Sequence, residues 1–349
     1  MKNIVFTGGG TAGHYSPNLA LIPLVKEDFD NIYYIGSVSG PEKSAMQKAG
    51  IPYYGITCVK LTRKFTLKNL AIPFKLLKGV NESEKILKKL SPSVVFSKGG
   101  YVALPVAVAA HRLKIPLITH ESDLSIGLAN KVASKYSTAV LTSFEKTAQT
   151  LPNAYYAGTP LREDLFKPRN KTEILKKYDL DPNKKVLLVT GGSQGSKSIN
   201  EIVQKCAHTL VKRYNVVHLC GKGKAPESTI SGYKAIEFAE DMGELYAIAD
   251  TAVSRAGANT LFELIALAIP TLAIPLPKGN SRGDQIENAK YFSDNGLIGL
   301  LLEENLSEKS FLKALDEVEN NREKIIENCK KTNYRNSAKA IAKYIKTFK

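Results

Sequence analysis

Two glycine-rich turns are the features of this sequence with the clearest chemical use. Residues 8–13 read Gly-Gly-Gly-Thr-Ala-Gly, and residues 191–195 read Gly-Gly-Ser-Gln-Gly. Each turn follows a short apolar run and leads into a segment with helical periodicity. Glycines in such a turn let backbone N–H groups approach a diphosphate at the start of a helix. One such turn can be a tight strand-to-helix connection and nothing more, but two of them favour a nucleotide-sized phosphate ligand.

The first turn also satisfies the dinucleotide-binding pattern G-x-G-x-x-G. That pattern requires an acidic residue at the end of the second strand, where it binds a ribose. Here the second predicted strand ends in Ile35, Gly36 and Ser37, none of which is acidic. The sequence therefore disfavours NAD.

Titratable side chains follow the first turn and a later strand. His14 comes directly after the turn and could act as a base, although a histidine at the start of a helix can equally be a structural hydrogen-bond donor. Glu121 directly follows a predicted strand and so belongs to the same edge of the sheet. Its neighbours Ser122 and Asp123 could instead cap the next helix.

The second half of the chain has its own candidate ligand-binding residues. Glu263 lies about one turn inside a predicted helix, where its carboxylate could accept two hydrogen bonds from a ribose diol, although most helical glutamates face solvent. A metal on the diphosphate would call for a D-x-D motif. The two matches, 28–30 and 179–181, precede strands, and we interpret them as loop residues. Backbone N–H groups, a helix dipole and Arg162 would then meet the diphosphate charge without a metal.

Short β-branched runs alternate with longer helical patterns, and these elements must position the residues above. The alternation is typical of βα units that form a parallel sheet, which binds ligands at the carboxyl ends of its strands. The predicted strands are 3–7, 32–36, 94–97, 117–120, 139–142 and 154–157 in the first half, and 185–190, 216–220, 235–238, 251–254, 271–274 and 297–301 in the second.

The two halves begin alike, which predicts an α/β protein of two Rossmann-like domains that face each other with a ligand between them. The seam is expected at 158–168, where Gly158, Pro160 and Pro168 interrupt the pattern. Residues 307–349 contain no proline and many helix formers, so we expect them to be helical and to pack across the seam.

Length and composition set the broad class. A chain of 349 residues exceeds what one core usually supports. Its four cysteines lie far apart without a C-x-x-C pair, which argues against a disulfide framework and a zinc site. Neither a membrane-spanning segment nor a signal peptide is evident, so we expect a cytosolic location. The formal charge of +16 favours a negatively charged partner.

Much of the positive charge lies in residues 60–89, which contain nine Lys or Arg and two Glu. Apolar residues recur there at helical spacing beside basic ones, as in segments that lie on anionic membranes. The apolar stripe could equally belong to a core, and Pro73 could bend the helix. The predicted membrane contacts are Leu67, Leu70, Phe74 and Leu77, with Lys68, Lys75 and Lys78. No nucleic-acid-binding motif is present, so nucleic acid fits less well.

Seven motifs in this order resemble those of the MurG family of bacterial peptidoglycan glycosyltransferases. They span nearly the whole chain, and although each one is only moderately specific, their shared order leaves little room for chance. The motifs are residues 7–14 with Pro17, 99–102, 120–121, 158–162, 191–195, 255–263 and 284–289.

The resemblance implies a GT-B architecture, in which two facing Rossmann-like domains enclose a deep inter-domain cleft. Residues 1–162 would form an acceptor-binding and membrane-associating domain, on which a helix at about 335–349 packs, and 163–334 a UDP-GlcNAc-binding domain. The implied reaction is the inverting transfer of GlcNAc from UDP-GlcNAc to the 4-hydroxyl of MurNAc in lipid I, the undecaprenyl-diphosphate-linked muramyl peptide, which yields lipid II. It implies neither a metal nor a cofactor, and a peripheral location on the cytoplasmic side of the cell membrane.

The resemblance also implies roles for individual residues. Glu263 would bind the ribose, Gln285 or Asp284 would lie near the sugar, and His14 would be the general base with Glu121 as the alternative. The other donor-binding residues would be Thr11, Ala12, Gly13, Arg162, Ser193, Ala239, Ala258 and Thr260. The acceptor would contact Gly9, Gly10, Gly99, Gly100, Tyr101 and Asp123.

Two residues depart from the family pattern. Asp123 stands where Asn is usual, and Asn18 stands where Gly is usual, which weakens the acceptor assignments more than the donor assignments. Other functions remain open at this point. They are another GT-B enzyme that uses a UDP-sugar, such as a glycolipid synthase or a UDP-GlcNAc epimerase, and a non-catalytic nucleotide-sugar sensor.

Overall fold

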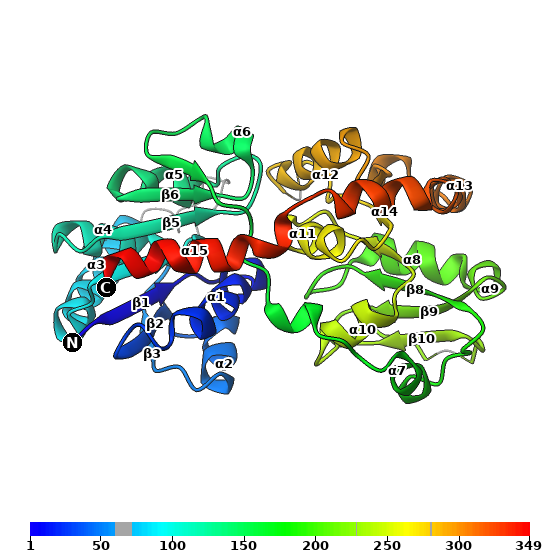
Figure 1. The fold of residues 1–349 in the computed structure, drawn as a ribbon, viewed down its shortest axis with the longest axis horizontal. Coiled ribbons are helices and arrows are strands. Elements are labelled where there is room, and N and C mark those ends of the chain that lie inside the picture. Colours follow the sequence, from blue (N-terminus) through cyan, green and yellow to red (C-terminus); the bar gives the residue numbers. More distant parts are fainter. Residues whose placement is uncertain (60–71, 228, 280) are drawn as a thin grey trace. The chain divides into compact units, whose positions relative to one another are not determined.

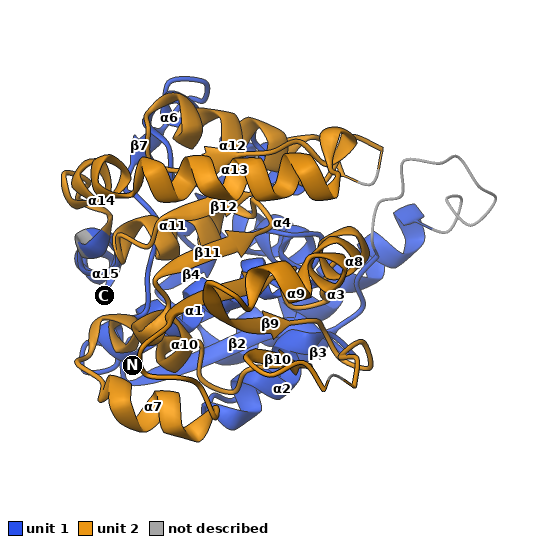
Figure 2. Ribbon diagram, turned by 90° about the vertical axis from the view of Figure 1, so that its right-hand side faces the viewer, with its two compact units in different colours: residues 1–162, 335–349 blue, residues 163–334 orange. Residues whose placement is uncertain are grey.

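The computed structural model describes residues 1–59, 72–227, 229–279 and 281–349 (Figure 1). The chain divides into two compact units (Figure 2). Unit 1 contains residues 1–162 and 335–349, and unit 2 contains residues 163–334. Each unit is built on one sheet, and in the described chain the paired strands of both sheets run parallel.

The sheet of unit 1 has seven strands in the order β3-β2-β1-β4-β5-β6-β7. The six strands predicted for this half are present, and the prediction missed only β3. This strand is short, contains Gly55 and directly follows Pro52, all of which weaken a strand pattern. The strands are β1 Asn3–Thr7, β2 Asn31–Ser37, β3 Tyr53–Ile56, β4 Val94–Ser97, β5 Leu117–Glu121, β6 Ala139–Thr142 and β7 Ala154–Tyr156.

Two hydrophobic clusters cover the two faces of this sheet. Ile4 and Phe6 of β1 point into one cluster and Val5 into the other, as the alternation of side chains along a strand requires. The described helices of unit 1 are α1 Ala12–Val25, α2 Pro41–Lys48, α3 Ile72–Leu90, α4 Ala103–Arg112, α5 Leu128–Ala133, α6 Glu145–Ala148 and α15 Ser337–Ile345.

Helix α15 packs along α1 of unit 1, although it comes at the end of the chain (Figure 1). Ala338, Ile341 and Ile345 share one face and are buried in the same cluster as Ile4. Beyond the helix, Lys346 and Lys349 form ion pairs with Asp28 at 2.7 and 2.8 Å. The chain therefore ends as part of unit 1.

The sheet of unit 2 has the order β10-β9-β8-β11-β12-β13, and all six strands predicted for this half are present with small shifts at their ends. The strands are β8 Lys185–Thr190, β9 Tyr214–Leu219, β10 Tyr233–Ile236, β11 Thr251–Ser254, β12 Thr271–Ala273 and β13 Gly299–Leu300. The helices are α7 Lys171–Lys177, α8 Lys197–Lys205, α9 Ala207–Leu210, α10 Met242–Ile248, α11 Ala258–Ala266, α12 Asp284–Asp294, α13 Glu308–Asn320 and α14 Arg322–Lys330.

Part of the predicted membrane segment belongs to α3. The structure describes this helix from Ile72 onward, and Pro73 is its second described residue. Phe74 is 75% exposed and Leu77 is 51% exposed, whereas Val80 is buried in the core of unit 1. Lys75 and Lys78 are exposed on the same helix, and Leu67, Lys68 and Leu70 lie outside the described residues. Among the described helices, none has the length and apolar character needed to cross a membrane.

Candidate active site

Each sheet has a point where the order of its strands reverses direction. In unit 1 the chain moves outward from β1 to β2 and β3, then returns to β4 on the other side of β1. In unit 2 the same reversal places β8 between β9 and β11. Open α/β sheets bind ligands at such switch points, beyond the carboxyl ends of the strands. The glycine turns follow β1 and β8, so both lie at a switch point.

His14 lies in the first turn of α1, directly after the turn that follows β1. Its ring packs on the backbone of Gly100, where an added Cβ would lie 3.0 Å from His14 Cδ2 and 2.6 Å from the Gly9 carbonyl oxygen. Gly100 also has a φ of +80°, which favours glycine. Burial lowers the pKa of His14, as does the charge of Lys98, while Glu121 and Asp123 act in the opposite direction. A neutral imidazole can accept a proton, as a general base must.

Lys98, which the sequence analysis did not single out, lies at the centre of this edge. It directly follows β4, and only 1% of its surface is exposed. Its Nζ lies 2.8 Å from His120 Nδ1 and donates a hydrogen bond to Ser122 Oγ. Burial lowers the pKa of Lys98 to about 8, and the nearby Glu121 and Asp123 oppose that effect. A lysine directly before a pair of glycines was the signal available in the sequence.

His120 connects Lys98 to the segment after β7 that contains Gly158. Its Nε2 lies 2.8 Å from the carbonyl oxygen of Gly158, which can only accept a hydrogen bond. Nε2 therefore carries the proton and Nδ1 accepts the hydrogen bond from Lys98. Burial and the charge of Lys98 hold the pKa of His120 well below its usual value. Its ring is thus a neutral bridge within the unit.

Glu121 is held by its own loop. Its carboxylate accepts hydrogen bonds from Asp123 N at 3.0 Å, from Gly127 N at 2.9 Å and from Asn130 Nδ2 at 2.9 Å. Three donors on one buried carboxylate indicate a residue that fixes the loop of residues 122–127. The expectation that Ser122 or Asp123 caps the next helix is wrong, because α5 begins at Leu128 and its N-cap is Gly127.

Glu42, which the sequence analysis also missed, is bound to the first glycine turn by a hydrogen bond. It is completely buried, accepts a hydrogen bond from Gly10 N at 3.0 Å and accepts another from Ser37 N at 3.0 Å. Gly9 and Gly10 were expected to contact the acceptor. The N–H of Gly10 is instead bound to an internal carboxylate, so this part of the turn cannot offer that donor to a ligand.

The other predicted residues of unit 1 lie in the first turn of α1, in the loop after β4 and at position 162. Thr11 is exposed and is the N-cap of α1. Ala12 and Gly13 are half-buried and belong to the first turn of this helix. Gly99 and Tyr101 flank Gly100 in the loop after β4, and the ring of Tyr101 packs on Gly10. Arg162 is half-buried at the end of the first segment of unit 1.

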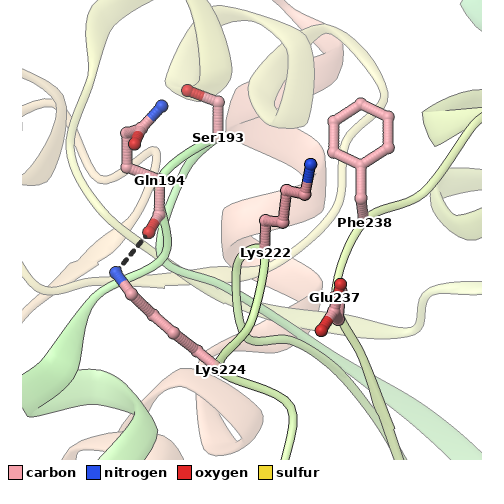
Figure 3. A pocket seen from close by; sticks show the side chains of 6 residues that line it. All are labelled: Ser193, Gln194, Lys222, Lys224, Glu237 and Phe238. Carbon is pink, nitrogen blue, oxygen red and sulfur yellow. Dashed lines mark hydrogen bonds between the residues drawn. The ribbon is translucent and has the colours of Figure 1, made fainter.

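In unit 2 the glycine turn of residues 191–195 packs closely on the end of β9. A Cβ on Gly195 would lie 1.9 Å from the carbonyl oxygen of Cys220, so only glycine fits there. Beside this turn is a pocket of 510 Å³ (Figure 3). Its lining comes from the loops after β8, β9 and β10, and consists of Ser193, Gln194, Lys222, Lys224, Glu237 and Phe238.

The lining of this pocket suits a phosphorylated ligand that also has a flat or apolar part. Lys224 Nζ donates a hydrogen bond to the backbone oxygen of Gln194 at 2.7 Å, which ties two of the loops together (Figure 3). Lys222 lies between Gln194 and the ring of Phe238 in the same view, and Phe238 is 68% exposed. Of these residues the sequence analysis assigned only Ser193 to the donor site, although Gln194 belongs to the same glycine turn. The run Gly-Lys-Gly-Lys at 221–224 was the signal that it missed.

The remaining predicted donor residues follow other strands of the same edge. Ala239 follows β10 and is buried, and Ala258, Thr260 and Glu263 belong to α11 after β11. Glu263 Oε2 accepts a hydrogen bond from Tyr246 OH at 2.9 Å, which fixes the carboxylate. Asp284 and Gln285 begin α12, and Gln285 Oε1 accepts a hydrogen bond from Leu276 N at 3.0 Å.

Arg255 connects several loops at the carboxyl edge of the unit 2 sheet. It is buried, forms an ion pair with Glu303, and donates to Ser196 Oγ at 2.6 Å and to the carbonyl oxygen of Ile274 at 3.0 Å. It thereby joins the start of α8 to the loop after β12. The carboxyl ends of β8, β11 and β12 are held together by one side chain.

The two D-x-D matches have structural partners. Asp28 forms the ion pairs with Lys346 and Lys349, and Asp181 Oδ1 accepts a hydrogen bond from Asn183 N at 2.9 Å in a turn. Among the residues that the structure describes, no group of three or more His, Cys, Asp or Glu is placed to hold a metal ion.

Comparison with known proteins places the chain in a family. Residues 4–142 match the N-terminal domain of glycosyltransferase family 28, and residues 186–345 match its C-terminal domain. A UDP-N-acetylglucosamine–N-acetylmuramyl-(pentapeptide) pyrophosphoryl-undecaprenol N-acetylglucosamine transferase from Clostridium botulinum (strain Langeland) is 45% identical over 100% of this chain and 99% of its own. The chain belongs to this transferase family. A relative of the same name from Clostridium perfringens (strain SM101) is 46% identical over 98% of this chain and 97% of its own. The MurG resemblance is thus confirmed.

Solved structures agree on the fold. MurG of Acinetobacter baumannii has a TM-score of 0.73 at 24% identity, and the alignment covers 99% of this chain and 100% of that one. A UDP-GlcNAc 2-epimerase from Neisseria meningitidis, solved with UDP-GlcNAc bound, has a TM-score of 0.68 at 15% identity over 100% and 99% of the two chains. With the two parallel-sheet units, these likenesses confirm the predicted GT-B fold class.

Replacement of Glu42 by Gln tests whether its carboxylate holds the first glycine turn. Gln has one acceptor oxygen, so one of the N–H groups of Gly10 and Ser37 would lose its partner, and we expect the free energy of unfolding to fall by about 1–3 kcal/mol. Because the chain has no Trp, urea unfolding is followed by far-UV circular dichroism. The control is Glu27→Gln, an exposed position in the same unit, with an expected change within about 0.5 kcal/mol. Equal stability of the two variants would contradict this role of Glu42.

Proposed function

We propose that this protein transfers N-acetylglucosamine from UDP-GlcNAc to the 4-hydroxyl of the muramyl sugar in lipid I, the undecaprenyl-diphosphate-linked muramyl pentapeptide, and so forms lipid II. One observation carries the proposal. Relatives that are 45% and 46% identical over nearly their whole lengths are named for transfer of N-acetylglucosamine to an N-acetylmuramyl-(pentapeptide) pyrophosphoryl-undecaprenol. The chemistry of the two switch points agrees with it.

The donor binds to unit 2 in this proposal. The pocket beside residues 191–195 supplies Ser193 and two lysines, which suit a diphosphate, and the exposed ring of Phe238, which suits a nucleobase. Glu263, already oriented by Tyr246, would accept hydrogen bonds from the ribose diol. Gln285 or Asp284, at the start of α12, would contact the sugar, and Ala239, Ala258 and Thr260 would complete the site. Arg162 would add its charge to the diphosphate.

His14 of unit 1 is the general base of the proposed reaction. As the acceptor oxygen forms a bond to the anomeric carbon of GlcNAc, its proton passes to the neutral imidazole. The bond between the anomeric carbon and the UDP oxygen breaks at the same time, and UDP leaves with the electron pair. Attack from the face opposite the leaving group inverts the configuration at that carbon. No step requires a metal or a cofactor.

The acceptor binds to the first turn of α1 and to the loops after β4 and β5. Residues 11–13 would face the acceptor diphosphate and the donor sugar, whereas the N–H of Gly10 is bound to Glu42. The positive end of the α1 dipole favours an anion at that place. Gly99, Tyr101 and Asp123 would border the same acceptor.

We also propose that α3 brings unit 1 to the cytoplasmic face of the membrane. An acceptor with a polyprenyl chain must be met at a lipid surface. Phe74 and Leu77 are exposed apolar side chains, and Lys75 and Lys78 beside them can meet anionic lipids. The protein would thus be peripheral.

Transfer is tested by the release of UDP. Purified protein with UDP-GlcNAc should release UDP only when a lipid-linked muramyl pentapeptide is added, and the product should gain one GlcNAc by mass spectrometry. Release of UDP without the acceptor, or an epimerised donor, would overturn the proposal.

His14→Ala should lower kcat by about 10²–10⁴-fold, because the attacking hydroxyl loses its base. The dissociation constant for UDP-GlcNAc, measured by calorimetry, should stay unchanged, since His14 is not among the proposed donor-binding residues, nearly all of which belong to unit 2. His208→Ala serves as the control, because His208 is exposed on α9. A His14→Ala variant with wild-type turnover would remove this histidine from the chemistry.

Phe74→Glu should weaken binding to vesicles that contain phosphatidylglycerol. Burial of one Phe side chain is worth about 1.5–3 kcal/mol, so the vesicle partition coefficient should fall by about tenfold or more. The control is Tyr155→Glu, because Tyr155 is an exposed aromatic residue on β7 of the same unit. If both variants bind vesicles equally, α3 is not the membrane contact.

A further inference from the structure

Three buried polar side chains of unit 2 form a hydrogen-bonded chain that the reaction described above does not use. They are Tyr233 at the start of β10, His218 on β9 and Asn200 on α8. His218 is completely buried, and Tyr233 and Asn200 are each 7% exposed. Tyr233 OH lies 2.7 Å from His218 Nδ1, and His218 Nε2 lies 3.1 Å from Asn200 Oδ1. Such a buried chain costs stability unless each of its groups is paired.

The last partner of this chain fixes the direction of every hydrogen bond in it. Asn200 Nδ2 lies 2.9 Å from the carbonyl oxygen of Cys220, which can only accept a hydrogen bond. The amide nitrogen therefore faces Cys220, and Asn200 Oδ1 accepts from His218 Nε2. Burial lowers the pKa of His218 to about 4, so the ring is neutral at neutral pH and its Nδ1 accepts from Tyr233 OH. Each of the three side chains thus donates toward Cys220.

The carbonyl oxygen of Cys220 is the point where the glycine turn of residues 191–195 meets the loop after β9. An added Cβ on Gly195 would lie 1.9 Å from this oxygen, and one on Gly221 would lie 2.6 Å from the Gln194 carbonyl oxygen. The two glycines also have φ angles of +67° and +94°, which favour glycine. The two loops therefore pack backbone against backbone, and a shift of Cys220 would move one loop against the other.

These two loops supply most of the pocket to which the donor diphosphate is assigned. The glycine turn contributes Ser193 and Gln194 to the lining, and the loop after β9 contributes Lys222 and Lys224 (Figure 3). The bond from Lys224 Nζ to the Gln194 carbonyl oxygen joins the loops at an exposed position. The bond that Asn200 donates joins α8 to the end of β9 in the interior. A diphosphate that contacts both loops requires a fixed distance between them.

We propose that His218 is a positioning residue for the diphosphate of the donor. By fixing the amide of Asn200, it holds the Cys220 carbonyl oxygen against the glycine turn, and so sets the distance between that turn and the two lysines. The inference rests on the proposed binding of UDP-GlcNAc to unit 2. His218 does not line the pocket, so its effect on the ligand passes through the two loops. Tyr233 completes the chain because it keeps the second nitrogen of the ring paired.

The test compares four variants of the full-length protein with the wild type. His218→Leu removes both hydrogen bonds of the ring. Tyr233→Phe removes only the outer one, so it carries the test if the Leu variant does not fold. His218→Gln is the conservative variant, because its amide N–H can still donate to Asn200. The matched control is Asn215→Ala: Asn215 is 1% exposed at the amino end of β9 and donates to two backbone carbonyl oxygens before β8, neither of them in the pocket lining.

We expect the Kd of UDP, measured by calorimetry, to rise about tenfold in His218→Leu and about threefold in Tyr233→Phe, because the two loops lose the separation that the diphosphate requires. The KM for UDP-GlcNAc should rise with it, and the KM for the acceptor should not. His218→Gln should bind UDP more tightly than His218→Leu. Asn215→Ala should unfold more easily than the wild type but keep the wild-type Kd.

Two measurements without ligand examine the chain itself. Hydrogen exchange of residues 191–195 and 221–224, followed by mass spectrometry, should be faster in His218→Leu and unchanged in Asn215→Ala. The imidazole nitrogen NMR signals of His218, assigned by their loss in His218→Gln, should show the proton on Nε2. A proton on Nδ1 would reverse the chain and overturn the inference.

An unchanged Kd of UDP in His218→Leu also overturns the inference, and where that variant does not fold, an unchanged Kd in Tyr233→Phe does so. An equal rise of the Kd in Asn215→Ala would show an effect of stability alone and has the same consequence. If the wild type binds UDP but does not use lipid I, the proposed function fails while the UDP titrations still decide the role of His218. If it does not bind UDP, the proposed donor site fails, and hydrogen exchange still decides whether His218 holds the two loops together.

Discussion

A parallel sheet that is covered on both faces leaves only the ends of its strands for polar chemistry. In β1, Ile4 and Phe6 enter one hydrophobic cluster and Val5 the other, so no face of the strand is free for a charged group. In unit 1 the charged residues Lys98 and Glu121 lie where strands β4 and β5 stop. Because the strands are parallel, their carboxyl ends share one edge, and the reversal of strand order brings the loops after β1 and β4, or after β8 and β11, side by side.

Buried charges hold these edges in shape. Glu42 binds the N–H of Gly10 beneath the first turn, Lys98 joins the loops after β4 and β5, and Arg255 joins α8 to the loop after β12. Each is nearly inaccessible to solvent, and removal of any one would leave buried partners unpaired. The edge is therefore preorganised before any ligand arrives.

The sequence predicted the scaffold better than the site. Twelve of the thirteen strands in the described residues follow from β-branched runs, and the glycine turns mark the two switch points. Glu42 and Lys98 were missed because a single charged residue in a loop gives no periodic signal, and only the fold shows that it is buried. Conversely, Glu121 was interpreted as a possible base because of its place after a strand. In the structure its carboxylate accepts three hydrogen bonds from the residues that follow it, Asp123, Gly127 and Asn130. Contacts between residues far apart in sequence decide such cases.

Asn18 and Asp123, the two residues that depart from the family pattern, each interact with neighbouring groups of unit 1. Asn18, which stands where glycine is usual, is buried and donates to the Thr7 carbonyl oxygen at 3.2 Å and to Tyr34 OH at 3.1 Å, and Tyr34 in turn donates to the Gly8 carbonyl oxygen at 2.7 Å. The side chain thus supports the glycine turn. Asp123 adds a negative charge where a neutral amide is usual, and this charge acts on both His14 and Lys98. A carboxylate there would raise the pKa of the histidine, and the lysine opposes that effect.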